Sequence, residues 1–343
     1  MRFRKIVVAA SLMVAGTVVS GAQPAAADPP HRPGGPCIQE NQNVSRSSVA
    51  GYNDVVQGLD RIARTSNGLV EVQSAGRSGE GRELLYAKIG AGPDVFWLQA
   101  RIHGDELHGT ESALQVLKLL AGESPDARLI REKMTLIVVP MYNPDGAEAN
   151  IRQSTTPTRI DLNRDWENFA QPESRAWYPV WTRFRPRLAL DLHHMGTAPV
   201  VNGTNELDHF QIGVRPIDPS RMTDLQWLTA RQMSMVTANA LTGFGQTHIA
   251  RYPEIDITNA VLSRMLLGGP GPDGSDPGFK TQGAIFYEIR SVGQKSNGYI
   301  EQMFNVPTMA LLTTVAQGRL GQIDVSALTS IPFGTHGECG RDV

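Results

Sequence analysis

Short apolar segments alternate with helical patterns along most of this chain. Four mostly apolar segments have the length of a strand: 95–100, 135–140, 188–192 and 284–287. Helical spacing of apolar residues occurs at about 51–66, 110–120, 222–242 and 307–317. Continuous apolar runs are typical of strands buried on both faces, and strands that alternate with helices indicate an α/β fold. We therefore expect a central sheet that is covered by helices on both sides.

Gly and Pro residues mark the turns between these elements. Two further strand-like segments, 69–75 and 83–89, flank the Gly-containing segment 76–82 and predict a β-hairpin. Pro307 is expected in the first turn of the last helix, where the missing N–H of proline costs no hydrogen bond. Residues 267–279 include ten Gly, Pro or Asp residues, so we expect a loop there that forms the rim of a site.

The composition excludes two classes of protein. Of the 343 residues, 41% are hydrophobic and 19% are charged, which is too apolar for a disordered chain. The formal net charge is −2 at pH 7 and the Lys and Arg residues do not cluster, so we expect no nucleic acid partner. Because no internal repeat or charged linker divides the sequence, one domain is favoured over two.

The first residues have the pattern of a secretion signal. Three basic residues within the first five precede an apolar run at 6–22, and residues 25–27 form an Ala-Ala-Ala cleavage site. We expect residues 1–27 to be removed and the mature protein to be secreted, without a membrane partner. An uncleaved membrane anchor is the alternative, although the apolar run is shorter than the roughly 20 residues of a spanning helix.

Cys37 and Cys339 are the two cysteines of the chain. An exported protein meets an oxidising compartment, where an even number of cysteines favours pairing. One disulfide bond would then join an N-terminal tail, 28–47, to a C-terminal tail, 321–343, on either side of a domain at 48–320. Two unpaired thiols are the alternative.

Polar side chains follow the apolar strands, at the edge of the sheet where α/β proteins bind ligands. His103 and Glu106 come directly after the strand at 95–100 and can converge on one point. Zinc sites of hydrolases often use two His and one Glu and leave a position for water. The alternative is that Glu106, together with Glu111, only favours the N-terminus of the following helix.

Two further polar groups lie at the ends of apolar strands. Because strand side chains alternate, Asp191 and His193 point to one face and His194 to the other. His193 is therefore the expected third metal ligand, with a hydrogen-bonded core histidine as the alternative. Glu288 follows the last apolar strand, where desolvation raises the pKa of a carboxyl group and makes it a proton carrier. A surface pair of Glu288 with Arg290 is the alternative.

A fourth polar group lies in the loops after the strand at 135–140. The segment 143–146 (Asn-Pro-Asp-Gly) is a strong turn signal without chemistry of its own. Arg152, Asn163 and Arg164 follow in adjoining loops and can bind a carboxylate by paired hydrogen bonds. As isolated residues they are ordinary surface groups.

Taken in chain order, six segments over about residues 48–318 resemble the zinc carboxypeptidases. They are 76–82 (Gly-Arg-Ser-Gly-Glu-Gly-Arg), 103–106 (His-Gly-Asp-Glu), 143–146 (Asn-Pro-Asp-Gly), 161–166 (Asp-Leu-Asn-Arg-Asp-Trp), 191–193 (Asp-Leu-His) and 286–290 (Phe-Tyr-Glu-Ile-Arg). The resemblance implies a single α/β domain with a central mixed sheet of about eight strands flanked by helices, and one catalytic Zn²⁺ per chain. The implied activity is hydrolysis of the C-terminal peptide bond.

The resemblance also implies which residues hold the metal. His103, Glu106 and His193 would be the three protein ligands of zinc, which is the ligand set of carboxypeptidase. Asp161 would be the carboxylate that orients the imidazole of His103 from behind. Such a site activates a water molecule for attack on a carbonyl carbon.

The remaining site residues would act on the substrate. Glu288 would be the general base that takes a proton from the zinc-activated water and passes it to the leaving amine. Arg152 would stabilise the oxyanion together with the metal. Asn163 and Arg164 would bind the terminal carboxylate, so the implied partners are peptide or protein C-termini. We expect the protein to be a monomer.

Some positions depart from the pattern of pancreatic-type members. Asp105 stands where those proteins have an arginine, so the oxyanion role falls more heavily on Arg152. Tyr252 is the nearest candidate for the mobile tyrosine of that group. Three aspartates in the segment that sets side-chain preference either select a basic terminal residue or are surface groups: Asp256, Asp273 and Asp276.

Two other functions stay open at this point. A related zinc amidohydrolase, acting on N-acyl amino acids or cell-wall peptides, would keep the same set of two histidines and one glutamate. An inactive family member that only binds peptides usually lacks a metal ligand or the catalytic acid, and this chain has all of them. The leading prediction is therefore a secreted zinc metallocarboxypeptidase.

Overall fold

The computed structural model describes residues 49–195, 208–214, 217–246, 248–253, 257–290 and 296–335. Within these ranges eight strands form one mixed sheet in the order β1-β2-β4-β3-β5-β8-β6-β7. The strands are β1 (Val70–Arg77), β2 (Glu83–Ile89), β3 (Asp94–Ala100), β4 (Met134–Val139), β5 (Leu188–Met195), β6 (Phe210–Gly213), β7 (Ile249–Arg251) and β8 (Gly283–Arg290). The expectation of a mixed sheet of this size is confirmed.

The four central strands β4, β3, β5 and β8 run in the same direction. They are the four apolar runs of the sequence, and β4 and β5 are buried along their whole length. The predicted hairpin of β1 and β2 joins β4 on one side, and β6 joins β8 on the other, both in antiparallel orientation. Because parallel strands end at the same edge of a sheet, the residues that follow β3, β5 and β8 meet there.

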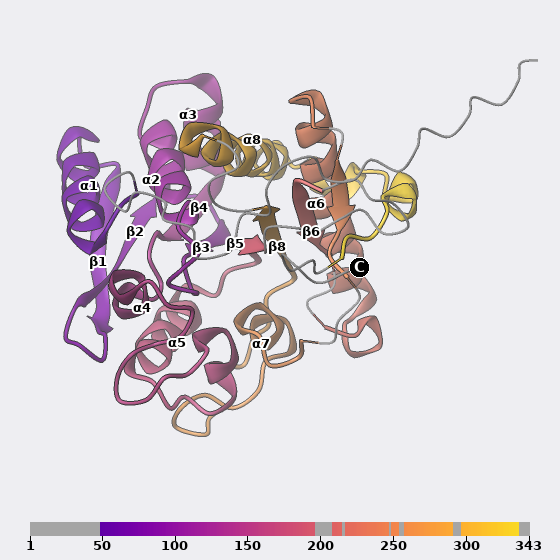
Figure 1. Cartoon of the computed structure of the whole chain (residues 1–343). Helices are drawn as coiled ribbons and strands as arrows, with labels where there is room; N and C mark the ends of the chain where they lie inside the picture. The colour runs from indigo at the N-terminus through magenta and orange to yellow at the C-terminus, as the bar shows by residue number, and fades with distance from the viewer. Residues whose placement is uncertain are drawn as a thin grey trace, which may run out of the picture.

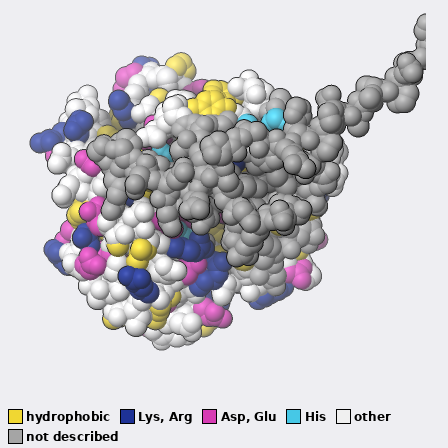
Figure 2. Space-filling model, in the orientation of Figure 1, with side chains coloured by type: hydrophobic (Ala, Val, Ile, Leu, Met, Phe, Trp, Pro, Cys, Tyr) yellow, Lys and Arg dark blue, Asp and Glu magenta, His cyan; other side chains and the backbone are white. Residues whose placement is uncertain are grey.

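Helices cover both faces of the sheet. They are α1 (Tyr52–Thr65), α2 (Gly109–Leu120), α3 (Pro125–Lys133), α4 (Pro144–Ala149), α5 (Pro172–Phe184), α6 (Asp224–Gly243), α7 (Val261–Leu267) and α8 (Asn297–Ala316), with short 3₁₀ helices η2 (Leu162–Glu167), η3 (Pro219–Arg221), η4 (Leu320–Gln322) and η5 (Ser326–Ser330). Helices α2, α3, α6 and α8 lie on one side of the sheet, and α4, α5 and α7 lie on the other (Figure 1). On the described part of the face in Figure 2, basic and acidic side chains are interspersed.

The last long helix begins earlier than predicted. Helix α8 starts after Ser296, whose side chain caps the helix by accepting the N–H of Tyr299, and Pro307 lies inside the helix. The expectation that Pro307 occupies the first turn is therefore wrong. An interior proline costs about 3 kcal/mol, and the burial of residues such as Met303 and Phe304 in the same helix offsets this cost.

Helix α5 and several short elements are not evident from the sequence. The helical pattern of α5 is obscured by Pro179 and by large aromatic residues, of which Trp177 and Trp181 are buried. The short elements without a recognisable periodicity are α3, α4, α7, β6 and β7. None of the helices in the described ranges is both long and apolar enough to cross a membrane.

Buried carboxylates fasten the loop of the β1–β2 hairpin to the rest of the domain. Asp145 accepts a hydrogen bond from Oγ of Ser78 at 2.7 Å, and Glu173 accepts the N–H of Gly79 at 3.0 Å. A Cβ atom at Gly79 would lie 2.1 Å from the carbonyl oxygen of Thr156, so this close approach requires glycine. The hairpin loop is thus held against the segment that follows α4.

The Glu173 carboxyl group is expected to destabilise the fold at neutral pH. Burial raises its pKa from 4.5 to about 7, so between these values only the folded chain binds the proton, and its contribution to stability grows as the pH falls. We expect Glu173→Gln to be more stable than the unmodified protein by ~1–3 kcal/mol above pH 7, with the difference disappearing towards pH 4.5. Urea unfolding of both proteins across this pH range, at one metal concentration, measures the effect. A difference that does not change with pH would contradict it.

Candidate metal centre

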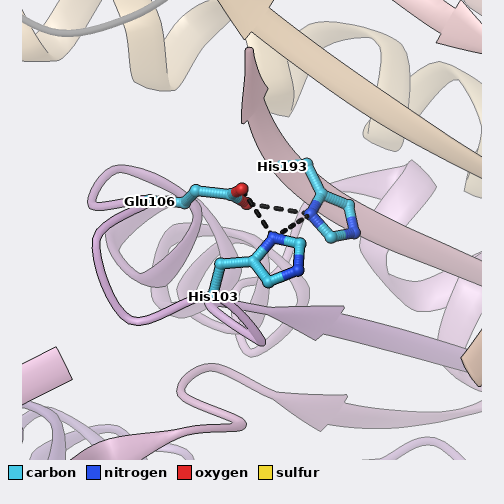
Figure 3. A group of neighbouring side chains, drawn as sticks. All are labelled: His103, Glu106 and His193. Atoms are coloured by element: carbon cyan, nitrogen blue, oxygen red, sulfur yellow. Dashed lines mark hydrogen bonds and ion pairs between the residues drawn. The ribbon is translucent and has the colours of Figure 1, made fainter. Parts of the chain in front are cut away.

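Three buried side chains from two segments converge on one point. His103 and Glu106 lie in the turn after β3, and His193 lies on β5 (Figure 3). Glu106 Oε1 is 2.6 Å from Nδ1 of His103, and Glu106 Oε2 is 2.8 Å from Nδ1 of His193. The two Nδ1 atoms are 3.2 Å apart. The structure thus brings together the three residues that the sequence analysis singled out as metal ligands.

Strand pairing and one supporting side chain explain why this turn lies close to His193 on β5. Strands β3 and β5 are parallel neighbours with Ala100 opposite Leu192, so the turn after β3 begins beside the end of β5. Asn143 supports the turn, since its side chain donates to the carbonyl oxygen of Ile102 at 3.3 Å and accepts the N–H of Gly146 at 2.9 Å. The Asn-Pro-Asp-Gly segment therefore has a supporting role, which its sequence alone does not reveal.

Two carboxylates hold the imidazoles from behind. Asp161 Oδ1 lies 3.2 Å from Nε2 of His103, as the sequence analysis expected for Asp161. Asp191 Oδ2 lies 2.9 Å from Nε2 of His193, a contact that the sequence analysis did not assign. Metal-binding histidines usually bond a carboxylate through the second ring nitrogen, which fixes the tautomer and the orientation of the ring. The signal for Asp191 was the spacing of two residues along one strand.

Asp191 is itself held by a chain of buried hydrogen bonds. Gln99 on β3 donates to Oδ2 of Asp191 at 2.7 Å, and the indole N–H of Trp97 donates to Oε1 of Gln99 at 2.7 Å. The described side chains Trp97, Gln99, Asp191 and His193 therefore form a continuous series across two strands. Such a series keeps the His193 ring fixed before any metal binds.

The three converging residues are strongly coupled by their charges. Burial alone raises the pKa of Glu106, but the neighbouring His103 and His193 outweigh burial and hold the pKa well below its usual value. In turn, the carboxylates of Glu106, Asp161 and Asp191 outweigh burial and raise the pKa of His103 and His193. The group therefore attracts positive charge, which protons on the imidazoles or a metal cation would supply.

The donor atoms fit zinc in kind, and the two imidazole nitrogens also fit it in spacing. Two imidazole nitrogens and one carboxylate form a frequent ligand set of catalytic zinc. Tetrahedral zinc with bonds of about 2.0–2.1 Å holds its ligand atoms roughly 3.3 Å apart. The 3.2 Å between the Nδ1 atoms of His103 and His193 is close to that spacing, whereas the Glu106 oxygens lie at hydrogen-bond distances of 2.6 and 2.8 Å from these nitrogens. The residues present therefore fit a zinc ion at this point.

Arg152 lies against the metal ligands. Its Nη1 is 3.1 Å from Nδ1 of His103 and 3.5 Å from Oε1 of Glu106. Its Nε and Nη2 donate to Oδ2 of Asp161 at 3.2 and 3.1 Å. Burial alone raises the pKa of Asp161, but its bond to His103 and the charges of His103 and Arg152 hold the pKa well below the usual value. Asp161 therefore positions both an imidazole and a guanidinium group.

Glu288 lies beside the three ligands on the neighbouring strand. In the pairing of β5 with β8, Glu288 stands opposite His193. Its Oε2 has no hydrogen-bond partner within the described ranges, and its side chain lines the same pocket as His103 and His193. Burial raises the pKa of Glu288 to about 7. An unpaired carboxyl group with this pKa can take and return a proton near neutral pH.

The pocket beside the ligands contains every other residue that the sequence analysis proposed for the substrate. Asn163 and Arg164, both on η2, line it together with Arg152. Asn163 Oδ1 accepts the N–H of Val261 at 2.9 Å, which attaches η2 to the start of α7. Among the described residues, the carboxamide nitrogen of Asn163 has no hydrogen-bond partner, so it can donate to a ligand. The remaining lining residues are His103, Asp191, His193, Tyr252, Ile257, Ala260, Leu262, Phe286 and Glu288.

The apolar wall of the pocket was not found from the sequence. Ile257, Ala260 and Leu262 come from the segment that leads into α7, where no periodicity marks them as site residues. Tyr252 lies with its ring 4.9 Å from that of Phe286. Burial first, and then the negative charge of Glu288, raise the pKa of Tyr252, so its phenol is neutral at pH 7.

The Gly- and Pro-rich loop 267–279 does not form the rim of this pocket, so that expectation is wrong. None of its residues lines the pocket. The ring of Phe279 lies 4.3 Å from that of Trp181, and a Cβ atom at Gly271 would lie 2.5 Å from Cε1 of Tyr178. The loop is therefore anchored on α5 by aromatic packing.

Two of the three aspartates considered as selecting a basic residue are surface groups. Asp273 and Asp276 are exposed, and each accepts hydrogen bonds from its own loop. Asp256 lies outside the described residues. The expected secretion signal and the expected bond between Cys37 and Cys339 also lie outside them and stay predictions.

Known proteins resemble this chain in sequence. A family model described as zinc carboxypeptidase matches residues 55–242. Probable carboxypeptidase 2 of Arthroderma benhamiae and carboxypeptidase 2 of Trichophyton tonsurans are each 32% identical to this chain over 145 residues. These matches cover 39% of this chain and only 27% of the length of each fungal relative.

Solved structures resemble it in fold. The metallo-carboxypeptidase from Burkholderia cenocepacia superposes with a TM-score of 0.59 at 19% identity, over 78% of this chain and 69% of that chain. Carboxypeptidase A from Helicoverpa armigera superposes with a TM-score of 0.55 at 18% identity, over 82% and 76% of the two chains. Because the family model spans more than half of the sequence and these folds agree, the chain belongs to the zinc carboxypeptidase family.

Proposed function

We propose that this protein is a zinc-dependent metallocarboxypeptidase that removes the last residue of a peptide. The observation that carries the proposal is the shared pocket of two kinds of residue. His103 and His193, which converge with Glu106, line it together with the carboxylate-binding candidates Asn163 and Arg164. A scissile bond next to a free carboxylate can therefore reach the metal centre.

The metal would be held by the three converging side chains. His103, Glu106 and His193 supply the donors, while Asp161 and Asp191 keep the two rings in place. Zinc, when bound, lowers the pKa of a water molecule to about 7 and polarises a carbonyl oxygen. The protein supplies fixed donor atoms in a buried pocket for this chemistry.

Glu288 moves the proton in this mechanism. Its carboxylate faces the pocket one strand away from His193, so it can take a proton from water and give it to the leaving amine. Arg152, held by Asp161, places a guanidinium group where negative charge develops on the carbonyl oxygen.

Asn163 and Arg164 form a carboxylate clamp, and this clamp makes the enzyme an exopeptidase. A guanidinium group binds a carboxylate with two parallel hydrogen bonds, and Arg164 and Asn163 are adjacent on η2. This contact holds the last amide bond in place over the metal ligands, and such positioning lowers the barrier of the reaction. A peptide with an amidated C-terminus lacks the charge that this clamp requires.

The apolar wall points to the side chain that is released. Ile257, Ala260, Leu262 and Phe286 line the pocket next to the clamp, whereas Asp273 and Asp276 do not. Fully burying a side chain such as Leu or Phe is worth about 1.5–3 kcal/mol, and an unpaired ammonium group would be costly there. We infer a preference for apolar C-terminal residues. Given the N-terminal sequence pattern, we place this activity outside the cell.

A panel of peptides tests the clamp and the preference together. We expect cleavage of peptides ending in free Leu or Phe, slower cleavage of those ending in Lys, and none of amidated peptides. Arg164→Ala removes charge-assisted bonds of about 1.5–3 kcal/mol and should raise KM about 10–150-fold. Arg159→Ala, at an exposed arginine nearby, is the control.

The outcomes of the panel distinguish a carboxypeptidase from an amidohydrolase, and an apolar from a basic preference. Equal cleavage of amidated peptides, or preferred cleavage of N-acyl amino acids, would favour the related zinc amidohydrolase. Preferred release of Lys or Arg would contradict the apolar preference while leaving the exopeptidase activity intact.

A further inference from the structure

Two buried histidines lie behind the metal ligands and take no part in the mechanism above. The rings of His108 and His194 stack with their centroids 5.3 Å apart and an angle of 19° between their planes. His194 also lies with its ring 5.8 Å from that of Phe304 on α8. Both nitrogens of His108 and Nδ1 of His194 have no hydrogen-bond partner in the described part of the chain.

One hydrogen bond joins the two segments that supply the metal ligands. Nε2 of His194 accepts the backbone N–H of His108 at 3.2 Å. His194 follows the ligand His193 on β5, and because strand side chains alternate, it points to the opposite face. His108 comes two residues after the ligand Glu106 and directly precedes α2.

The two ends of the ligand-bearing turn are fastened differently. At its start, the backbone N–H of Gly104 donates to the carbonyl oxygen of Arg152 at 3.3 Å. At its end, a Cβ atom at Gly109 would lie 3.0 Å from Cβ of Ala100 and 3.3 Å from Cβ of Leu192, so α2 begins in close contact with β3 and β5. The hydrogen bond from the backbone N–H of His108 to Nε2 of His194, called the tie below, adds a directional contact at this second end.

We propose that His194 is a positioning residue for the metal ligands. Its Nε2 holds the Glu106 end of the turn against the strand that carries His193, so that the carboxylate and the imidazole keep the spacing that one ion requires. This inference rests on the proposed zinc site. His108 contributes its backbone N–H to the tie, and its ring contributes packing.

Three variants separate the tie from simple packing. His194→Gln keeps a side-chain acceptor at a similar reach, whereas His194→Asn is polar but too short to reach the N–H of His108. His108→Phe keeps both the backbone donor and an aromatic ring. Zinc affinity of each protein is measured by competition with a chelating dye at one pH, and the thermal midpoint is measured without metal.

We expect the zinc affinity of His194→Asn to fall about 10–100-fold, the range known for residues that support metal ligands. His194→Gln and His108→Phe should bind zinc nearly as tightly as the unmodified protein, even where their metal-free thermal midpoints fall. Unchanged zinc affinity in His194→Asn would overturn the proposal, as would an equal loss in His194→Gln or His108→Phe.

A second measurement on the unmodified protein covers the case in which His194→Asn does not fold. Coupling between two sites is reciprocal, so if the tie favours zinc, zinc must stabilise the tie. We expect zinc to slow amide hydrogen exchange at His108 more than at Leu117 in α2. Equal slowing at both amides would overturn the proposal. Failure of the unmodified protein to bind zinc would instead reject the metal site itself.

Discussion

Replacing Glu288 by glutamine is expected to lower kcat by about 10²–10⁴-fold, the usual contribution of a general base. The amide keeps the size and polarity of the side chain but cannot accept a proton from water. Because Glu288 is not among the three converging ligands, we expect the variant to bind zinc as the unmodified protein does. KM should change little, since the clamp on η2 is separate from Glu288.

The pH dependence of this variant provides a second test. A general base must be ionised, so kcat/KM of the unmodified protein falls as the pH falls through the pKa of Glu288. Burial raises that pKa to about 7, and a bound cation lowers it again, so we place the acid limb of the profile below pH 7. Glu288→Gln should lack this limb.

Steady-state kinetics with a peptide ending in Leu, together with metal analysis, measure both effects. Asp276→Asn, at an exposed aspartate outside the pocket, is the matched control and should behave like the unmodified protein. A variant Glu288→Gln that contains one zinc ion and retains full kcat would contradict the assignment of Glu288 as the base.

Removal of zinc is expected to abolish hydrolysis and to weaken the fold at the same time. A ligand present at 1,000 times its Kd stabilises the state that binds it by about 4 kcal/mol, and only the folded chain brings His193 next to His103 and Glu106. We expect a chelator to remove activity and to lower the thermal midpoint, and added zinc to restore both. Magnesium should restore neither, because it prefers oxygen ligands.

His193→Ala should reproduce the effect of the chelator without one. The variant loses one of three ligands and should no longer respond to zinc in activity or in thermal midpoint. His248→Ala, at a histidine outside the ligand group, is the control. Full hydrolysis by protein that metal analysis shows to be free of metal would exclude the zinc mechanism.

Much of the fold follows from local patterns in the sequence. The runs at 95–100, 135–140, 188–192 and 284–287 became the four central strands because a strand that is covered on both faces needs apolar residues at every position. Helix α8 shows the limit of this approach. Its start at Asn297 depends on the burial of its side chains among other helices, which outweighs the local signal of Pro307.

The candidate ligands could also be anticipated, because each follows or ends a central strand and such strands end together. The support of those ligands could not be anticipated. Alternation along β5 places Asp191 and His193 on one face, but the link of Asp191 to Gln99 and Trp97 requires the pairing of β5 with β3. The same holds for the bond from His108 to His194.

The sequence by itself determined the class of fold, the central strands and the chemical identity of the residues at their carboxyl ends. Only the tertiary structure decided which of those residues meet, that the wall beside the clamp is apolar, and that the loop 267–279 packs on α5 instead of the pocket. The physical reason is the difference between local and long-range interactions. Burial patterns record the environment of each residue, whereas a metal centre or a binding pocket depends on distances between segments far apart in the chain.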